Sequence, residues 1–216
     1  MPESDSFFDR AVDRVTKLRQ STHHAPADPR ADRVPPGQHL SSGFPVLHYG
    51  GVPRFDPARW DFRAYGLVAK PLTITWAEFG RLPTLREVVD IHCVTTWSKL
   101  DTVWEGVPFK HIAELVQPKP EARFVIAHCE QGFTTSLPMP VIMDDDVLLA
   151  TRYDDQPLTP EHGGPLRLLV PKRYFWKSAK WLRALEFVAE DQLGFWERAG
   201  YNNSADPWQE ERYAHA

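Results

Sequence analysis

Short apolar runs broken by prolines dominate the chain from about residue 60 onward. Runs of about four to eight apolar or alternating residues, bounded by turn residues, are typical of β-strands. Four segments have this texture, and we expect strands at residues 60–68, 86–94, 122–129 and 164–171. The middle of the chain is therefore rich in short strands.

Helical spacing of apolar residues marks a second set of segments. These segments are residues 75–82, 109–116 and 181–192, and each predicts a helix. They interrupt the strands without the regular alternation that builds a doubly wound parallel sheet. The pattern predicts an α+β fold, a single domain of mixed, short-stranded sheets with peripheral helices.

The N-terminal part of the chain has a different character. Phe8, Val12, Val15 and Leu18 stand at helical spacing on a charged segment, which predicts a short surface helix within residues 1–20. Residues 21–38 are rich in proline and poor in apolar side chains, so they predict an extended connector. We expect residues 1–38 to precede a compact domain at residues 39–216.

Composition and charge narrow the function classes. The 216 residues are 42% hydrophobic and include 8 Trp, as in compact globular proteins. The net charge is −4, with 25 basic and 29 acidic residues interspersed, so we expect neither nucleic acid nor anionic lipid as a partner. No run approaches the roughly 18 apolar residues of a membrane span, and the charged N-terminus lacks a signal-peptide core. We therefore expect no membrane partner and a cytoplasmic location.

Only two cysteines are present, Cys93 and Cys129, and a reducing compartment would keep both as free thiols. Cys93 ends a predicted strand, where scaffolds commonly present reactive groups, although buried packing is the more common role of a cysteine. Each cysteine follows a histidine, His92 or His128. Adjacent strand residues point to opposite faces, so this spacing argues against a shared zinc site.

A basic segment at residues 162–182 is the second candidate for chemistry. It combines Gly163 and Gly164 with several Arg and Lys side chains. Arginine forks and backbone amides near glycine are suited to a phosphate-bearing cofactor. A solvated basic face beside a strand explains the same pattern, because no established phosphate-loop motif is present.

The two segments together resemble the sulfite-oxidase-like molybdopterin oxidoreductases, most closely the short single-domain bacterial members. The motifs that carry the resemblance are DIHCVTTWSKLDTVWEGV, from residue 90, and PLTPEHGGPLRLLVPKRYFWKSAKWLRALE, from residue 157. Their order and spacing both agree with that family, and the similarity extends from about Pro36 to Tyr213. It implies the family's molybdopterin-binding fold and a molybdenum-dependent oxidoreductase.

The resemblance also implies particular site residues. Cys93 matches the thiolate that binds the metal, and a soft thiolate suits a dithiolene-bound metal. One molybdopterin with one molybdenum is implied per chain, whereas Cys129 matches no family ligand. The implied cofactor-binding residues are His48, Tyr49, His128, His162, Arg167, Ser178, Ala179 and Lys180.

Three positions depart from the sulfite oxidases proper. Ser98 and Val46 stand where those enzymes carry arginines, and Phe133 stands where they carry an active-site tyrosine. Burying a dianion without paired cations is costly. We therefore expect two-electron oxygen-atom transfer with a small neutral oxide, such as a sulfoxide or N-oxide, rather than with sulfite.

The sequence contains no CxxCH haem motif, so we expect electrons to pass to or from an external soluble partner. Two other hypotheses remain at this stage. One is a non-catalytic module that binds or carries molybdopterin, and the other is a metal-free protein with a basic face. Metal analysis and redox assays distinguish the three.

Overall fold

The computed structural model describes residues 30–214, so the helix expected within residues 1–20 and half of the connector expected at residues 21–38 lie outside the described residues. One compact unit comprises Arg33–Ala216. Within the described residues, no helix is long and apolar enough to cross a membrane. The expected division at residues 38 and 39 stays a prediction.

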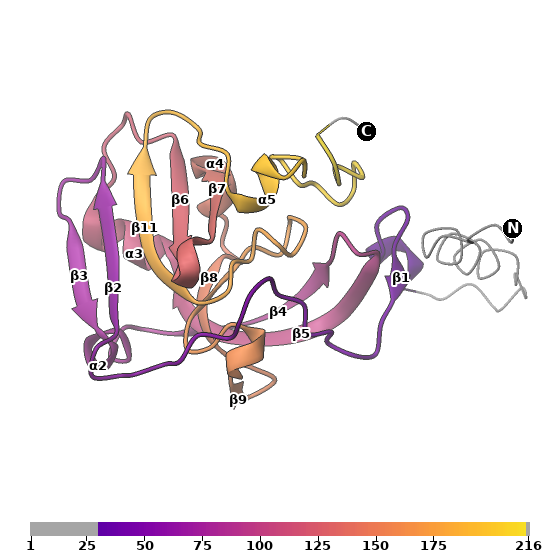
Figure 1. Ribbon diagram of the computed structural model, residues 1–216, viewed down its shortest axis with the longest axis horizontal. Coiled ribbons are helices and arrows are strands. Elements are labelled where there is room, and N and C mark those ends of the chain that lie inside the picture. The colour runs from indigo at the N-terminus through magenta and orange to yellow at the C-terminus, as the bar shows by residue number, and fades with distance from the viewer. Residues whose placement is uncertain (1–29, 215–216) are drawn as a thin grey trace, which may run out of the picture. The chain divides into compact units, whose positions relative to one another are not determined.

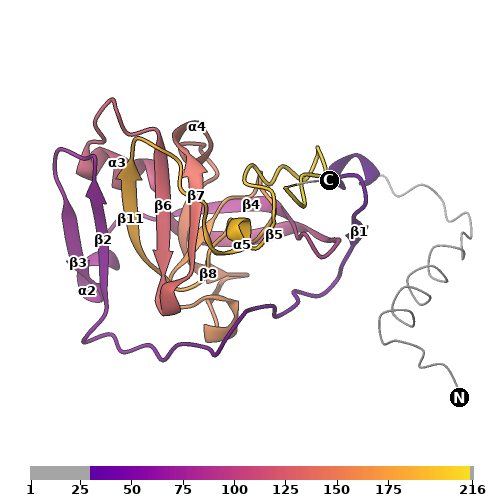
Figure 2. The ribbon, with the colours of Figure 1, turned by 45° about the horizontal axis from the view of Figure 1, so that its top comes forward.

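The strands form two sheets. A six-stranded sheet has the order β1-β5-β8-β10, with β4 paired to β5 and β9 paired to β8. A five-stranded sheet has the order β3-β2-β11-β6-β7, and Figure 2 shows these five strands side by side. The bounds in the first sheet are β1 His39–Leu40, β4 Leu85–His92, β5 Trp97–Pro108, β8 Leu148–Tyr153, β9 Gln156–Pro157 and β10 Arg167–Leu169. Those in the second are β2 Asp61–Gly66, β3 Leu72–Thr75, β6 Phe124–Cys129, β7 Thr134–Pro138 and β11 Leu182–Val188.

The helices are short, and most of them connect one strand to the next along the chain; Figure 1 labels α2, α3, α4 and α5. α3 occupies Phe109–Val116, the whole of the segment predicted from its apolar spacing. α2 covers only Trp76–Phe79, and it begins at a capping box in which Thr75 and Glu78 satisfy each other's backbone amides. The remaining helical turns are η1 Ala31–Arg33, η2 Glu130–Gly132, α4 Met139–Ile142, η3 Pro160–His162 and α5 Phe195–Arg198.

The helix predicted at residues 181–192 is wrong, because most of that segment is strand β11. β11 pairs in parallel with β2 and antiparallel with β6, which places it in the middle of the five-stranded sheet. Leu, Arg, Ala and Glu favour helices locally, but tertiary pairing overrides such preferences. A register shift between Leu182 and Ala184 also disturbs the alternation that would have revealed the strand.

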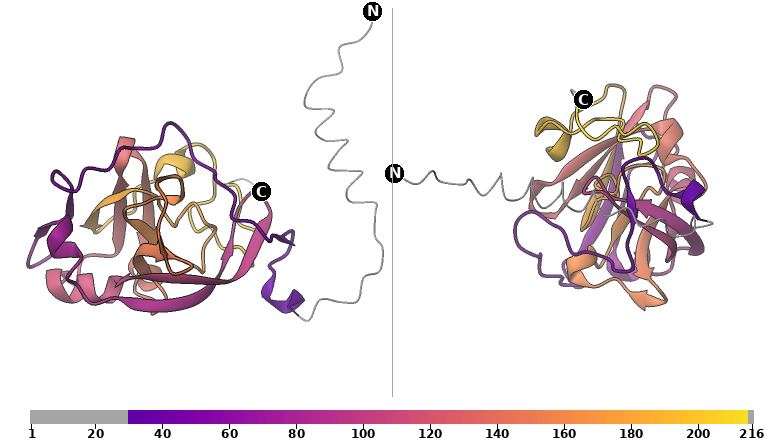
Figure 3. Two further views of the ribbon diagram at one scale, coloured as in Figure 1. Left: turned by 90° about the horizontal axis from the view of Figure 1, so that it is seen from below. Right: turned by 90° about the vertical axis from the view of Figure 1, so that its right-hand side faces the viewer.

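Two apolar clusters form the core. The larger one packs α3 and the five-stranded sheet together, and it contains Phe62, Phe109 and Phe187. The smaller one surrounds Cys93 and contains Trp97, Trp104 and Phe175. Figure 3 shows the segment between β1 and β2 running from one sheet to the other, and this segment carries several residues of the site. The fold class predicted from the sequence, α+β with mixed sheets, is confirmed.

Candidate active site

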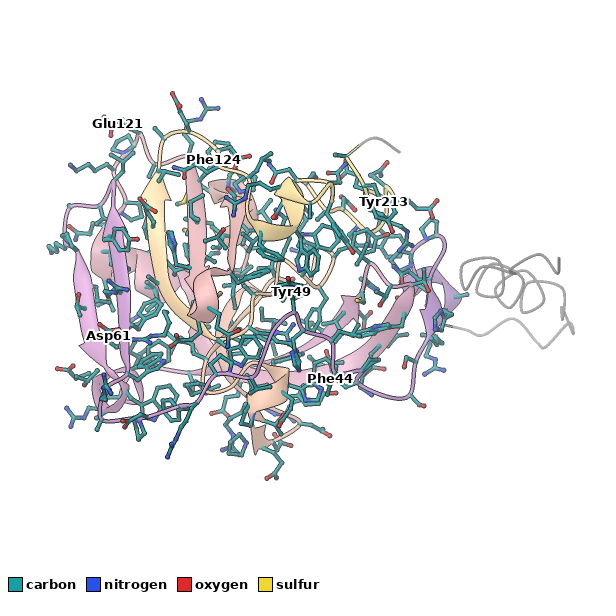
Figure 4. All side chains as sticks on the ribbon, in the orientation of Figure 1. Phe44, Tyr49, Asp61, Glu121, Phe124 and Tyr213 are labelled. Carbon is teal, nitrogen blue, oxygen red and sulfur yellow. The ribbon has the colours of Figure 1, made fainter. Side chains whose placement is uncertain are left out.

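A cavity of about 440 Å³ opens beside the smaller cluster. Cys93 and Arg167 contribute to its wall, and most of the remaining wall is aromatic. Figure 4 labels Phe44 and Tyr49, which reach the cavity from the segment that precedes β2. The aromatic wall consists of Phe44, Tyr49, Trp97, Phe133, Phe175, Trp176, Trp181, Phe195, Trp196 and Tyr201.

Cys93 lies in the tight turn that joins β4 to β5. Its amide donates to the carbonyl of Trp97 at 2.8 Å, and the amide of Thr96 donates to the carbonyl of Cys93 at 2.9 Å. Thr96 closes the turn with a φ of +74°, which is unusual for a β-branched residue. The Cys93 sulfur lies 3.1 Å from Thr95 Oγ1, and burial raises the pKa of the thiol. A metal ion would have to displace the thiol proton to bind here.

The neighbouring His92 points away from this chemistry. Its Nδ1 lies 2.8 Å from Ser98 Oγ, and burial lowers the pKa of the ring to about 4. Ser98 is fully buried and does not contribute to the described cavity wall. Ser98 lies opposite His92 in the β4–β5 hairpin. The argument from the missing arginine at this position to a neutral substrate stays a prediction.

Arg167 is the buried cation of the cavity. It is 2% exposed and extends from β10, where Nη1 donates to the carbonyl of His162 at 2.9 Å. Its guanidinium carbon lies 3.9 Å from the ring centroid of Phe175, and Nε has no hydrogen-bond partner. Burial lowers the pKa of Arg167 to about 9. Among the described ion pairs none involves Arg167, so this cation suits an anionic ligand.

The segment Ser178–Lys180 forms the adjacent wall. Ser178 Oγ accepts from the amide of Val170 at 2.9 Å, and Lys180 Nζ donates to the carbonyl of Glu161 at 2.5 Å. Burial, followed by the charge of Arg167, lowers the pKa of Lys180 to about 7. Gly163 has a φ of +106°, and a side chain there would meet Lys180 at 3.0 Å. Glycine at position 163 thus leaves room for the Lys180 side chain. A bound anion would raise the pKa of Lys180 again and keep this side chain charged.

His48 and Tyr49 complete one side of the cavity. His48 Nδ1 lies 3.0 Å from the carbonyl of Gly50, and its ring meets Trp181 edge-on at 5.8 Å. Tyr49 is 70% exposed at the rim, 5.3 Å from the ring of Phe195. His162 lies just behind the wall, stacked on Phe44 at 4.1 Å. The structure therefore gathers seven predicted residues on the cavity wall: Cys93, His48, Tyr49, Arg167, Ser178, Ala179 and Lys180.

His128 is not brought to the cavity. Its Nε2 lies 2.8 Å from Glu186 Oε2, and its ring stacks on Tyr65 across the five-stranded sheet. Adjacent residues of β6 point to opposite faces of the sheet, so the side chains of His128 and Cys129 diverge. Glu130 and Gln131, just after the strand, line the cavity instead. The sequence could have indicated Glu130 and Gln131, because they directly follow a predicted strand and loop residues at strand ends commonly form binding sites.

A second hollow of about 720 Å³ adjoins the first and shares Glu130 and Trp181 with it. Arg54, Arg59 and Arg183 contribute to its wall. The guanidinium of Arg183 is neutralised by Glu130 and Asp61, which leaves Arg54, Arg59 and Asp56 as the other charged groups on this wall. This hollow extends the polar side of the site.

The residues present fit a thiolate-bound, phosphate-bearing cofactor. Arg167 is buried, no carboxylate within residues 30–214 pairs with it, and its Nε has no hydrogen-bond partner there. A neutral ligand would leave that charge unbalanced, whereas a phosphate or an electron-rich pterin would satisfy it. Cys93 supplies a soft ligand on the same cavity wall.

Comparisons with known proteins agree with this geometry. Residues 49–196 match the family model described as the oxidoreductase molybdopterin binding domain. The chain is 48% identical over 185 residues to "Uncharacterized oxidoreductase YuiH" of Bacillus subtilis, covering 85% of this chain and 93% of that protein. It is 30% identical to the "Protein-methionine-sulfoxide reductase catalytic subunit MsrP" of Campylobacter jejuni, covering 66% of this chain and 54% of that protein.

A solved structure is also similar. The sulfane dehydrogenase SoxCD from Paracoccus pantotrophus superposes with a TM-score of 0.62 at 25% identity. The similarity covers 74% of this chain and 47% of that chain. The chain thus spans nearly all of one relative and about half of the others.

Proposed function

The chain belongs to the family of oxidoreductases with a molybdopterin-binding domain, and on this premise we propose that its cavity receives a neutral oxide such as a sulfoxide or N-oxide. It is a molybdopterin-dependent oxidoreductase. The bound cofactor supplies two-electron oxygen-atom transfer. The protein supplies the metal ligand, the orientation of the cofactor and the selection of substrate.

One observation carries the proposal. Buried Arg167 has no carboxylate partner, and it shares a largely aromatic cavity wall with Cys93. The other charged side chains on the described wall are Lys180 and Glu130. If Arg167 and Lys180 are neutralised by the cofactor, no cation remains on that wall to balance a substrate dianion. An uncharged oxide with apolar substituents is then favoured, because its desolvation costs less than that of a dianion and aromatic rings pack against its substituents.

We assign the residues as follows. Cys93 binds the metal through its sulfur, and Arg167 and Lys180 donate charged hydrogen bonds to the pterin or its phosphate. Ser178 and Ala179 present polar groups of their segment, and His48 and Tyr49 also line the cavity. His162 supports this arrangement from behind Phe44. His128 has no part in the proposed site.

The reaction requires an electron partner. Reduction of a sulfoxide to a thioether consumes two electrons and two protons and releases water. The chain's own described residues offer no second redox group beyond thiols, so a separate electron-transfer protein would supply the electrons. MsrP, the relative named as a catalytic subunit, carries a name that includes methionine sulfoxide, which supports the substrate class. We also propose that the partner is soluble and that the enzyme works in the cytoplasm. Fractionation of cells that produce the full chain tests the location.

The deciding experiment combines metal analysis with a substrate panel. We expect one molybdenum and one pterin per purified chain, and turnover with sulfoxides or N-oxides that exceeds turnover with sulfite. Cys93→Ser is expected to lose the metal–thiolate absorption and turnover while remaining folded. Cys129→Ser is the matched control, because Cys129 is buried elsewhere in the larger core cluster.

Each contrary result has a defined meaning. Molybdopterin bound without any turnover would support the carrier module instead. Full activity of Cys93→Ser would overturn the site assignment. Faster turnover of sulfite than of every neutral oxide would overturn the substrate class.

A further inference from the structure

Arg212, near the C-terminus, contacts the turn that carries Cys93. Its Nη1 donates to the carbonyl of Val94 at 2.7 Å, although the two residues are 118 positions apart. The C-terminal tail, residues 199–214, is drawn in yellow in Figures 1 and 2. It lies beside the end of the β4–β5 hairpin. The family model ends at residue 196, so this contact comes from outside the matched domain.

Three successive carbonyls of the turn are held from outside it. The carbonyl of His92 accepts from the amide of Phe175 at 2.8 Å. The carbonyl of Cys93 accepts from Gln38 Nε2 at 3.1 Å, and that of Val94 accepts from Arg212. Carbonyls that would otherwise face water are thus fixed on both sides of the sulfur-bearing residue.

The guanidinium of Arg212 is itself held in place. Its central carbon lies 4.9 Å above the ring of Tyr174, which is fully buried. Gly37 leaves room for it, since a side chain there would approach Arg212 Nη2 to 3.1 Å. The amide of Asn202 donates to the carbonyl of Arg212 at 3.1 Å, which ties the tail back on itself. A stacked and anchored guanidinium makes a more rigid support than a free side chain does.

From these contacts we propose that Arg212 is a positioning residue, which holds the turn that presents the Cys93 sulfur. The proposal rests on the proposed function insofar as that function makes Cys93 the metal ligand. The tail thereby becomes part of the site: Tyr201 lines the cavity, and Arg212 supports the ligand from behind. Outer contacts of this kind orient metal ligands and are often needed for full metal retention.

The test compares Arg212→Met and Arg212→Lys with Arg198→Met in the full-length holoprotein. Arg198 is exposed and also donates to a carbonyl, that of Leu193 at 3.2 Å, so its variant removes the same kind of bond elsewhere. Hydrogen exchange is followed in peptides that cover residues 92–98. Absorption of the metal–thiolate chromophore and molybdenum content are measured on the same samples.

We expect amides of the turn to exchange about tenfold faster or more in Arg212→Met, because a hydrogen bond from a charged group is removed. Arg212→Lys should fall between this variant and the wild type, since lysine keeps one donor but loses the planar stacking. The metal–thiolate band should shift or weaken in Arg212→Met, while Arg198→Met leaves both signals unchanged.

Unchanged exchange of the turn in Arg212→Met would overturn the proposal, and so would an unchanged chromophore in a variant that retains its metal. If Arg212→Met does not fold, Arg212→Lys provides the same comparison. A wild-type protein without molybdenum would refute the proposed function. The exchange data would then still decide whether Arg212 holds the turn.

Discussion

Lys177 and Glu197 form an ion pair in which both side chains are completely buried, with 2.5 Å between Nζ and Oε1. Lys177 also donates to the carbonyl of Ser136 at 2.9 Å, and Thr135 Oγ1 donates to Glu197 at 2.6 Å. Lys177 directly precedes the Ser178–Lys180 segment, and Glu197 lies in α5 beside Trp196. The pair therefore connects two walls of the cavity through β7.

Removing one partner should be strongly destabilising. Burial lowers the pKa of Lys177, and the charge of Glu197 opposes that shift. We expect Lys177→Met to lower the free energy of unfolding by about 3–5 kcal/mol, because it leaves a buried carboxylate without its cation. Urea unfolding of the purified protein measures the loss. The double variant Lys177→Met/Glu197→Leu should recover most of it, and a single-variant cost below about 1 kcal/mol would contradict this account.

Lys180 gives the cofactor-free protein a specific pH dependence. Its pKa is about 7 in the folded protein and near 10.5 when unfolded, so the unfolded state binds more protons between these values. Stability should therefore rise as the pH increases from about 7 to about 9, the reverse of the effect of a lysine stabilised by an ion pair. The urea midpoint should therefore be higher at pH 9 than at pH 7 in the wild type, and this difference should be smaller in Lys180→Met. Lys119→Met, at an exposed position, is the control, and an equal rise in both variants would count against the shift.

Thr96 is predicted to store strain in the Cys93 turn. A left-handed backbone costs a residue with a side chain about 1–2 kcal/mol, whereas glycine adopts it freely but loses more entropy on folding. Thr96→Gly should therefore stabilise the protein by about 0.5–1 kcal/mol, as measured by urea unfolding. Thr95→Gly provides the comparison, because the φ of Thr95 is not positive, so this substitution adds flexibility without relieving strain and also removes the contact with the Cys93 sulfur. Destabilisation by both substitutions to the same extent would rule out strain at Thr96.

The local pattern of apolar residues predicted some elements of the fold correctly. It failed for elements whose conformation depends on pairing with residues distant in the sequence. The amphipathic spacing of Phe109–Val116 predicted α3 correctly, since one face of this helix packs on the core. β11 was missed because its helix-forming residues become a strand only through pairing with β2 and β6. Resemblance, taken position by position, pointed to Arg167 and Lys180, which line the cavity. His128 contacts Glu186 and lies outside the described cavity wall, and its expected role in binding the cofactor stays a prediction.

The aromatic wall of the cavity and the role of the tail could not be predicted from the sequence, because both depend on contacts between distant residues. Phe44 and Phe195 line one cavity although about 150 positions separate them, and no local spacing encodes that meeting. The structure shows that Tyr201 lines the cavity and that Arg212 reaches the Cys93 turn.

Trp196 should select substrates by their apolar substituents. It lies on the cavity wall within 5.3 Å of Tyr201 and 5.1 Å of Phe195, ring to ring. An aromatic contact contributes about 0.5–1.5 kcal/mol beyond burial, so Trp196→Ala should lower kcat/KM for methyl phenyl sulfoxide by about 2–10-fold more than for dimethyl sulfoxide. Steady-state assays of both oxides measure this ratio. Leu193→Ala removes an exposed apolar side chain near the same helix and should leave the ratio unchanged. Equal losses for the two oxides in Trp196→Ala would show that this ring supports the fold without contacting the substituent.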